Sequence, residues 1–467
     1  MGAPEQGRFS FQLLKSMESI IDRRIFFKIA ATGVAGYFVS PLQTMAQTVT
    51  TTPGATIFGT ARNCVFVLLA GGPSHMDTLD LRVGSWTPVD FSPTTINSID
   101  WPNGLLPNLG AQLNSNRFSI IRSCQSLALV HALLQNWNQI ARNPANATGK
   151  IAPNIGSVVA LEMEAQRRPG QKLPGFLSLN GGGSLAGSGY FSGKYAPFDV
   201  SPSANGISNL NHPDGEAVFT SRYNVLMAGD ALLRGTPSPI GTPVDEVSDF
   251  YTSARTMMYD PIVTNAFRFS AADQQKYGNS SFGSACVTAR NVLQADLGVR
   301  YIQITLGGWD NHTNIYAPNN GIYPSARQLD AGLGNLIADL ASMPGSQGRT
   351  MLDDTLIVAK GEFGRTVGNI TGGGGRDHYY IHSTLIGGGG VQGGRALGKT
   401  TPDAGYVDDP GWSEQRPVYA EDIAATIYSA LGINYTTVRH DDPLGRGFEY
   451  IPQNQAWLGT PITELFH

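Results

Sequence analysis

Four short segments of this chain, each opening with glycine, combine carboxylates with histidine or arginine. Their polar residues are His75, Asp77 and Asp80; Asp310 and His312; Glu362 and Arg365; and Arg376, Asp377, His378 and His382. Imidazole nitrogens and carboxylate oxygens together suit zinc, manganese, iron or calcium. Asp310 and His312 are two residues apart, so in an extended loop both side chains point the same way. The pattern predicts a metal centre in which cysteine takes no part.

The members of these groups differ in how well they suit a metal site. A lone Asp or His in a loop often caps a helix or lies at the surface, and Asp80 is also suited to capping the segment that follows it. His75 is a similarly weak candidate. The residues that we predict as metal ligands are Asp77, Asp310, His312, Glu362, Asp377, His378 and His382.

Two arginines in the same loops indicate the kind of substrate. The guanidinium groups of Arg365 and Arg376 are suited to paired hydrogen bonds with a tetrahedral anion, although surface ion pairs are the alternative. Beside a metal ion, either arginine would stabilise negative charge that develops in a transition state. We therefore predict catalytic roles for both.

A serine after the second strand is the predicted nucleophile. Ser123 and Ser126 follow a strand expected over residues 118–122, where a helix is expected to begin. A hydroxyl at a helix N-terminus beside a metal would be activated, and the exposed amides would bind an anion. The alternative is that either serine only caps the helix. His131, further along the chain, either faces the site or is a core histidine whose ring nitrogens are hydrogen-bonded.

The elements that must position these residues belong to an α/β fold. Apolar runs typical of strands occupy residues 64–70, 118–122, 300–306, 355–360 and 383–386. Their continuous Val, Ile and Leu content indicates burial on both faces, as in a parallel sheet covered by helices. Helical spacing of apolar residues covers 325–343 and 421–431. We predict a mainly parallel central sheet flanked by helices, with the site beyond the carboxyl ends of its strands.

Composition limits the class of protein. The chain has 467 residues, 41% of them hydrophobic and 15% charged, with a net charge of -4, which excludes intrinsic disorder. No basic stripe is present, so no nucleic-acid partner is expected. Three cysteines at wide spacing do not form a disulfide framework. Residues 47–467 are predicted to form one domain, in which the Gly-, Ser-, Asn- and Pro-rich range of about 165–285 is an insertion or cap.

The N-terminal segment has the pattern of an export signal. Arg23 and Arg24 precede a modest apolar run over residues 29–40, which resembles a twin-arginine signal. This run is shorter than the roughly 20 residues that a membrane span requires. Residues 1–46 are therefore predicted to be a signal peptide, cleaved after Ala46. The expected partner is a twin-arginine translocase, and the expected location is periplasmic or secreted, in a bacterium, with no stable membrane span after cleavage.

Five motifs together carry a resemblance to a known family. They are LAGGPSHMDTLD, LGGWDNH, LIVAKGEFGRT, GRDHYYIHSTLIGGGGVQGG and EDIAATIYSALGI. In this order they resemble the family catalogued as domain of unknown function 1501, whose members are often labelled sulfatase-like and which is similar in fold to the alkaline phosphatase and arylsulfatase superfamily. The resemblance implies that Asp77 corresponds to the first metal Asp, Asp310 and His312 to the later pair, Glu362 to the Asp of the Asp-His-Gly signature, and His378 to the final His.

The sequence departs from the superfamily pattern at several points. Phe363 stands where Asp-His-Gly supplies a His, so one ligand of a two-metal site is missing unless Asp377 or His382 replaces it. The Asp-x-His spacing is shorter than the usual Asp-x-x-x-His. The sulfatase signature Cys-x-Pro-x-Arg, which yields a formylglycine nucleophile, is absent, so formylglycine chemistry is not expected.

These observations predict an exported, metal-dependent hydrolase of phosphate or sulfate esters. Its substrate would be a small-molecule or glycan ester, and its cofactor one or two divalent ions, zinc, calcium or manganese. The alternative is a catalytically inactive metal- or glycan-binding protein on the same fold. Phe363 and the missing nucleophile signature favour that alternative.

Overall fold

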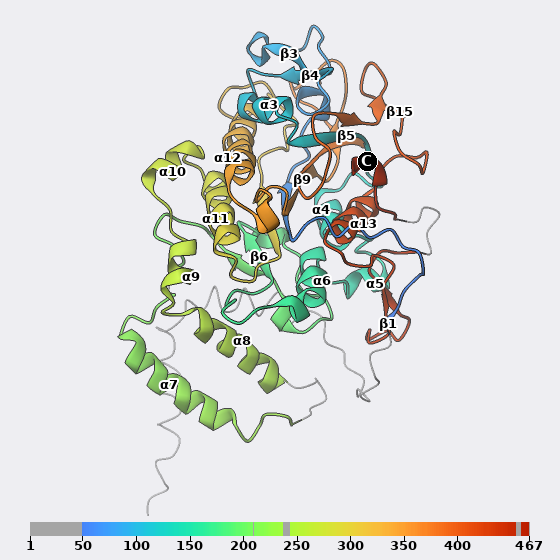
Figure 1. Ribbon diagram of the computed structural model, residues 1–467. Helices are drawn as coiled ribbons and strands as arrows, with labels where there is room; N and C mark the ends of the chain where they lie inside the picture. Colours follow the sequence, from blue (N-terminus) through green and yellow to red (C-terminus); the bar gives the residue numbers. More distant parts are fainter. Residues whose placement is uncertain (1–48, 209, 237–242, 454–458, 467) are drawn as a thin grey trace, which may run out of the picture.

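The computed structural model describes residues 49–208, 210–236, 243–453 and 459–466, and the twin-arginine motif lies outside this range. A central eight-stranded sheet lies between two layers of helices (Figure 1). Across the sheet, the strands are β13 (Ala396–Leu397), β5 (Phe118–Gln125), β12 (Ile381–Gly387), β9 (Thr355–Gly361), β2 (Asn63–Leu69), β8 (Tyr301–Leu306), β6 (Phe176–Leu179) and β7 (Phe198–Val200). The predicted α/β fold with a mainly parallel sheet is confirmed.

One strand of this sheet runs against all the others. β12 is antiparallel to both of its neighbours, β5 and β9, whereas every other pairing in the sheet is parallel. The start of β12 therefore lies at the edge where β2, β5, β8 and β9 end. Loops that follow those four strands and the segment that precedes β12 meet at this edge.

Burial on both faces explains why the strands are continuously apolar. In β2, Val65 and Val67 pack into the core on one face, and Phe66 and Leu68 pack into the core on the other. All seven residues of β2 are buried. Such a strand needs apolar residues at every position rather than at alternate ones.

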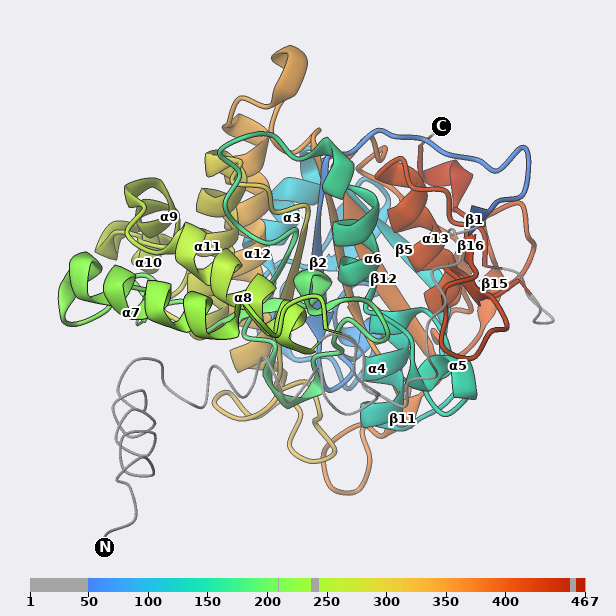
Figure 2. The ribbon, with the colours of Figure 1, turned by 90° about the horizontal axis from the view of Figure 1, so that it is seen from below.

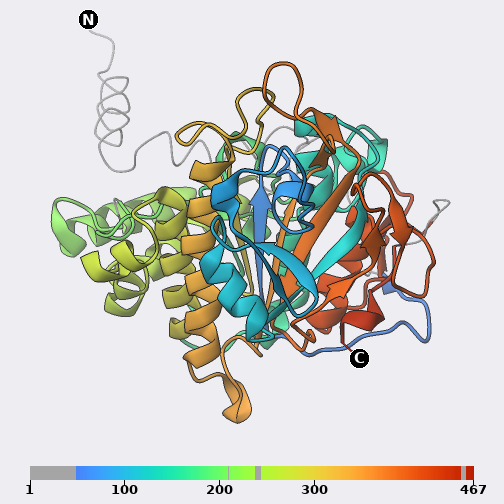
Figure 3. The ribbon, with the colours of Figure 1, turned by 90° about the horizontal axis from the view of Figure 1, so that it is seen from above.

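Two sets of helices cover the sheet (Figure 3). One core includes side chains of α3 (Pro107–Asn114), α11 (Ser281–Ala295) and α12 (Ile322–Ser342). The other includes side chains of α6 (Ile155–Glu162) and α13 (Ala420–Ala430). The helices predicted over 325–343 and 421–431 are α12 and α13, each shifted by one to three residues.

The range predicted as an insertion contributes to the sheet as well as to its periphery. The strands β6 and β7, of which β7 forms one edge of the sheet, lie within residues 165–285, together with the first five residues of α11. The same range contains α7 (Gly215–Asp230), α8 (Pro243–Met257), α9 (Pro261–Ala266) and α10 (Ala271–Lys276). No side chain of α7 is buried, and α7 lies at the left margin of Figure 2, away from the sheet.

The remaining elements are short. They are α4 (His131–Ile140), α5 (Ala147–Lys150), β1 (Val49–Thr50), β3 (Pro93–Ile96), β4 (Ile99–Pro102), β10 (Gly364–Arg365), β11 (His378–Tyr379), β14 (Lys399–Thr400), β15 (Val407–Asp409), β16 (Val438–Arg439) and β17 (Phe448–Glu449). Among the helices that the structure describes, none has the length and apolar character needed to cross a bilayer.

Candidate metal centre

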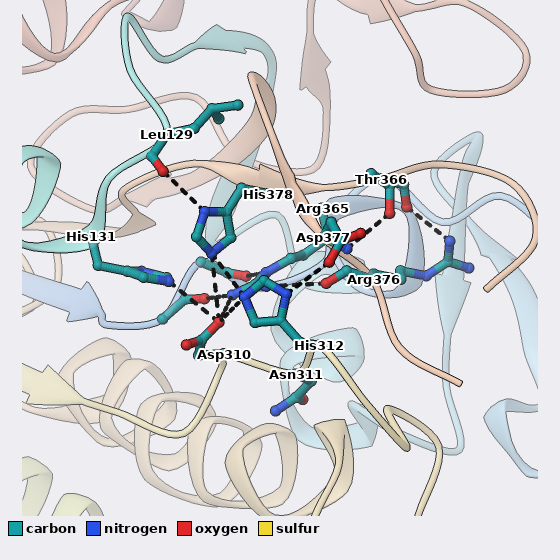
Figure 4. Close-up of polar contacts among 12 residues, drawn as sticks. Leu129, His131, Asp310, Asn311, His312, Arg365, Thr366, Arg376, Asp377 and His378 are labelled. Atoms are coloured by element: carbon teal, nitrogen blue, oxygen red, sulfur yellow. Dashed lines mark hydrogen bonds and ion pairs between the residues drawn. The ribbon is translucent and has the colours of Figure 1, made fainter. Parts of the chain in front are cut away.

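Four side chains from three separate segments gather at the edge where the strands end (Figure 4). His131 is the first residue of α4, Asp310 and His312 lie in the loop after β8, and His378 lies on β11. One ligand atom from each lies within 4.8 Å of all the others. The antiparallel β12 accounts for the position of His378, because this residue precedes its strand rather than following it.

The distances within this cluster suit a single metal ion. Oδ1 of Asp310 lies 3.0 Å from Nε2 of His312, 3.3 Å from Nε2 of His131 and 3.7 Å from Nε2 of His378. The two atoms Nε2 of His312 and Nε2 of His378 are 3.0 Å apart. Ligands at about 2.0–2.1 Å from a tetrahedral zinc ion stand about 3.3 Å from one another. The cluster therefore has nearly the dimensions of such a site.

Each of the three imidazoles is held by its other nitrogen. The contacts are His131 Nδ1 with Glu362 Oε1 at 2.6 Å, His312 Nδ1 with Asp377 Oδ1 at 2.8 Å, and His378 Nδ1 with the carbonyl oxygen of Leu129 at 2.9 Å. A carbonyl or carboxylate oxygen only accepts, so the ring proton belongs on Nδ1 in each case. The lone pair of each neutral ring then lies on Nε2, which faces the cluster.

Converging lone pairs need a positive centre among them. Burial, together with the positive charge of Arg365, lowers the pKa of His378, which disfavours a second proton on that ring. Nε2 of His131 is buried and makes no hydrogen bond, although Asp310 lies nearby. Histidines whose far nitrogen is held by a carboxylate or carbonyl are typical metal ligands. The donor set thus fits a divalent cation.

Arg365 holds the carboxylate of Asp310. Burial opposes ionisation of Asp310, but the hydrogen bond from Arg365, 2.7 Å long, and the positive charge of that side chain outweigh it and lower the pKa of Asp310. Arg365 also donates to the carbonyl oxygens of Gly71, Gly72 and Arg376. Its guanidinium is fully buried and joins three loops, rather than facing solvent where a substrate anion would bind.

The guanidinium of Arg376 is likewise occupied by hydrogen bonds within the protein. It donates to Oδ2 of Asp77 at 2.8 Å, to the Tyr316 hydroxyl at 3.0 Å, and to two backbone carbonyls of the loop that precedes it. Oδ1 of Asp77 accepts from the Tyr316 hydroxyl, and Oδ2 also accepts from Ser74. Both oxygens of Asp77 are therefore in use, and this residue lies outside the histidine cluster.

The other predicted ligands surround the cluster without joining it. Glu362 and Asp377 contact the far nitrogens of His131 and His312. His382, on β12, is buried, and burial together with the charge of Lys360 lowers its pKa well below the usual range. Asp80 is buried against Arg82 and Arg122, and His75 bonds the carbonyl oxygen of Ala404.

His131 brings a third imidazole into the cluster, whereas neither Asp377 nor His382 is part of it. The Phe363 ring is fully buried and packs against the rings of His131 and His378, with centroids 4.7 Å and 4.4 Å apart. An aromatic residue here thus supports two histidines of the cluster.

The expected helix start at Ser123 and Ser126 is wrong. β5 continues to Gln125 because Gln125 and Cys124 pair with β12. Ser123 lies within the strand and donates to the carbonyl oxygen of Pro410 at 2.8 Å, and Ser126 donates to that of Tyr380 at 3.1 Å. The helix after β5 is α4, and it opens on His131. A histidine that begins the first helix after a buried strand was the signal that could have singled this residue out.

One side of the cluster faces solvent. The side chains of Asp310, His312 and Asp377 are 49%, 43% and 60% exposed. Gly71 lies beneath the loop of Asp310, where a Cβ would come within 2.6 Å of the Asp310 amide nitrogen. The site is therefore closely packed on the side of Gly71 and accessible to solvent on the side of His312 and Asp377.

The chain is similar to several solved structures. A protein in the alkaline phosphatase superfamily from Vibrio parahaemolyticus is 10% identical, with 92% of this chain and 79% of that chain covered and a TM-score of 0.34. The lipoteichoic acid synthase LtaP from Listeria monocytogenes is 12% identical, with coverages of 82% and 76% and a TM-score of 0.36. A sulfatase from Pseudoalteromonas sp. is 11% identical, with coverages of 80% and 68% and a TM-score of 0.34.

No curated protein matches the sequence. One family does: the model described as a protein of unknown function, DUF1501, matches residues 61–449. This range includes every residue of the cluster and all eight strands of the central sheet. The chain therefore belongs to the DUF1501 family.

Proposed function

We propose that this chain is a metal-dependent hydrolase of phosphate or sulfate esters. The observation that carries the proposal is the convergence of three imidazole Nε2 atoms on Oδ1 of Asp310, with each Nδ1 held by an acceptor. The ordered motifs that resemble a sulfatase-like family support the class of ester. The substrate would be a small-molecule or glycan ester.

The ion would be held by His131, Asp310, His312 and His378. Three nitrogen donors favour zinc or manganese over calcium, which prefers oxygen ligands. When bound, a divalent ion supplies a Lewis acid that polarises the ester and lowers the pKa of water. The described residues contain one such group of ligands, so we propose one ion in it.

The chain's own residues prepare this site. Glu362, Asp377 and the carbonyl of Leu129 fix the orientation and tautomer of the three rings. Arg365 keeps the Asp310 carboxylate ionised and oriented toward the cluster. The exposed side, where His312 and Asp377 lie, would admit the ester.

The test is an assay of zinc- or manganese-loaded protein with aryl phosphates and aryl sulfates. We expect hydrolysis of one of the two classes, reduced at least about a hundredfold in His378→Ala because the ion is lost. Metal-loaded protein that binds its ion but cleaves neither class would contradict the proposal.

A specific observation favours a second candidate, a metal- or glycan-binding protein without catalysis. Ser123, a predicted nucleophile, lies in β5 with its hydroxyl bonded to Pro410, and Arg365 and Arg376 are both committed to loop contacts. Neither of these two arginines would then be available to stabilise a transition state. Metal binding without turnover of either ester class, and with saturable glycan binding, would support this candidate over the hydrolase.

We also propose export through the twin-arginine translocase to the periplasm or the exterior. The Arg23 and Arg24 pair before a short apolar run supports it. Changing both arginines to lysine should retain the unprocessed precursor in the cytoplasm. Continued export of that variant would contradict this part of the proposal. With a net charge of -4 and no basic stripe, we propose no nucleic-acid partner.

A further inference from the structure

A small polar cavity adjoins Glu362. Its walls include Glu362, Lys360, Asn138, His382 and Glu421, and its volume of about 10 Å³ is close to what one water molecule occupies. Glu362 thus links two environments. One of its oxygens, Oε1, accepts from Nδ1 of His131, and the residue also lines the cavity.

Three buried acceptor atoms of the cavity walls have no partner. They are Oε2 of Glu362, Oε2 of Glu421 and Nε2 of His382. All three residues are 4% exposed or less. The other oxygen of Glu421 accepts from Nε1 of Trp137 at 2.8 Å. Buried polar atoms are almost always hydrogen-bonded, so these atoms require donors from within the cavity.

The side chain of Lys360 supplies hydrogen-bond donors to the cavity. This residue, on β9, is 2% exposed, and its Nζ donates to Oδ1 of Asn138 at 2.6 Å. An ammonium group carries three hydrogens, so two are left for the cavity. Burial lowers the pKa of Lys360 to about 8, and the group is therefore still mostly charged at pH 7. Lys360 is the one basic side chain that lines this cavity, apart from the buried imidazole of His382.

We propose that Lys360 is a positioning residue of the metal centre, which acts through a cavity water on Oε2 of Glu362 and so fixes the carboxylate that orients His131. This inference rests on the metal centre of the proposed function. A water that accepts from Lys360 and donates to Oε2 of Glu362 and Nε2 of His382 makes three hydrogen bonds, the usual number for a buried water. The positive charge also compensates a carboxylate that is otherwise held only by the imidazole, an amide side chain and a backbone amide.

The test measures zinc affinity by competition with a chromophoric chelator. Lys360→Met removes the charge and keeps the length, and we expect it to weaken zinc binding by about tenfold or more, as loss of a ligand's supporting contact does. Glu362→Gln should weaken binding by at least as much. Since Lys360 acts through Glu362, the double variant should bind no more weakly than Glu362→Gln alone.

Non-additivity separates positioning from a general structural role. A lysine that only supported the fold would weaken the double variant further and lower the melting temperature of the metal-free protein. We expect that temperature to stay within a few degrees of wild type. Lys360→Gln, which still bonds Asn138, should repeat the loss of affinity if the methionine variant fails to fold.

The matched control is Arg300→Met. Arg300 is a buried basic residue directly before β8, so it lies at the amino-terminal ends of the parallel strands, opposite the cluster. The Arg300→Met variant should therefore leave zinc affinity unchanged. Wild-type affinity in Lys360→Met and Lys360→Gln, or additive losses in the double variant, would overturn the inference while leaving the metal centre intact. Absence of zinc binding in wild type itself would overturn both.

Discussion

Each imidazole of the cluster is held by an acceptor at Nδ1 and directs Nε2 into the cluster. Glu362 is the most constrained of the acceptors, since Oε1 takes hydrogen bonds from His131, Gln135 and the Gly71 amide and the residue is buried. Asp377 is mostly exposed, and its Oδ1 contacts only His312. Three neutral rings aimed at one carboxylate oxygen form a nitrogen-rich site, which discriminates against calcium and magnesium.

The histidines should be individually required for metal binding. His312→Ala and His378→Ala each remove a nitrogen ligand, so bound zinc should fall from about one per chain to less than about a tenth at low micromolar zinc. The measurement is elemental analysis after gel filtration. His440, an exposed histidine outside the cluster, provides the control, and its alanine variant should keep the wild-type zinc content. Full zinc content in His378→Ala would contradict the ligand assignment.

The two supporting carboxylates should differ in importance. Glu362→Gln disturbs a buried acceptor with three donors, so its loss of zinc affinity should lie within the range of about 10- to 100-fold. Asp377→Asn changes an exposed contact that an amide oxygen can partly replace, so we expect a loss of only a few-fold. Chelator competition measures both. An equal or larger effect of Asp377→Asn would show that burial does not set the strength of these contacts.

Residue types and spacing were sufficient to point to Asp310, His312 and His378. They could not separate a ligand from its support, because Glu362 and Asp377 have ligand chemistry but contact the far side of the rings. That distinction depends on shifts of a few ångströms in the relative positions of the loops. His131 stands in an otherwise apolar segment without glycine, so only the helix start after β5 distinguishes it from a core residue.

At the scale of elements, the ends of the strands determine the site. Continuous apolar runs made the strands predictable, since a strand that is buried on both faces has apolar residues at nearly every position. Strand direction leaves no such pattern: residues 383–386 predicted the strand β12, but its antiparallel pairing could not be read from them. The extension of β5 through Ser123 was missed for a related reason, because its polar residues are held extended by the neighbouring strand.

Ser123 should therefore matter for stability more than for chemistry. Ser123→Ala removes one buried hydrogen bond to Pro410, which should lower the free energy of unfolding by about 1 kcal/mol. Zinc affinity and any ester hydrolysis should stay within about twofold of wild type, since the hydroxyl is already engaged. Urea denaturation and the ester assays measure these quantities. Abolished hydrolysis in a folded, zinc-loaded variant would restore this serine as the nucleophile.

Glu421, in the first turn of α13, should make stability depend on pH. Burial raises its pKa from 4.5 to about 7, so between these values the folded chain holds a proton that the unfolded chain has lost. The folded state binds more protons there, and its stability relative to the unfolded state therefore falls as pH rises, by roughly 3 kcal/mol for this group.

Glu421→Gln removes that titration and keeps an acceptor for Trp137. Its stability should consequently decline less than that of wild type between pH 5 and pH 8. Urea denaturation at both pH values gives the comparison. The same decline in the two proteins would mean that Glu421 is already ionised at pH 5 in the folded chain.

At the scale of the whole molecule, one sheet brings together segments that are far apart in the chain. His131 lies in the first third of the sequence, Asp310 about two thirds of the way along and His378 in the last quarter, and each is placed by a different strand. Composition suggested an insertion over residues 165–285, but β6 and β7 within that range are the last two strands on one side of the sheet. Short strands among many Gly and Ser residues have too few apolar positions to be recognised.

Metal binding should stabilise the whole fold, because the ligands come from three distant segments that must be folded to meet. Zinc at about a hundred times its Kd would add about 2.7 kcal/mol, so a chelator should lower the melting temperature by a few degrees. Calorimetry with and without chelator measures the shift. His378→Ala should melt at the same temperature in both conditions, and a chelator-dependent shift in that variant would locate the stabilising ion elsewhere.

The most direct test of the metal centre is an anomalous diffraction measurement at the zinc edge on crystals grown with zinc. The cluster predicts one strong peak at about 2.0–2.1 Å from Nε2 of His131, His312 and His378 and from an oxygen of Asp310. A peak bound only by other residues, or no peak in a crystal that contains zinc at saturating concentration, would contradict the assignment of these four side chains as a metal site.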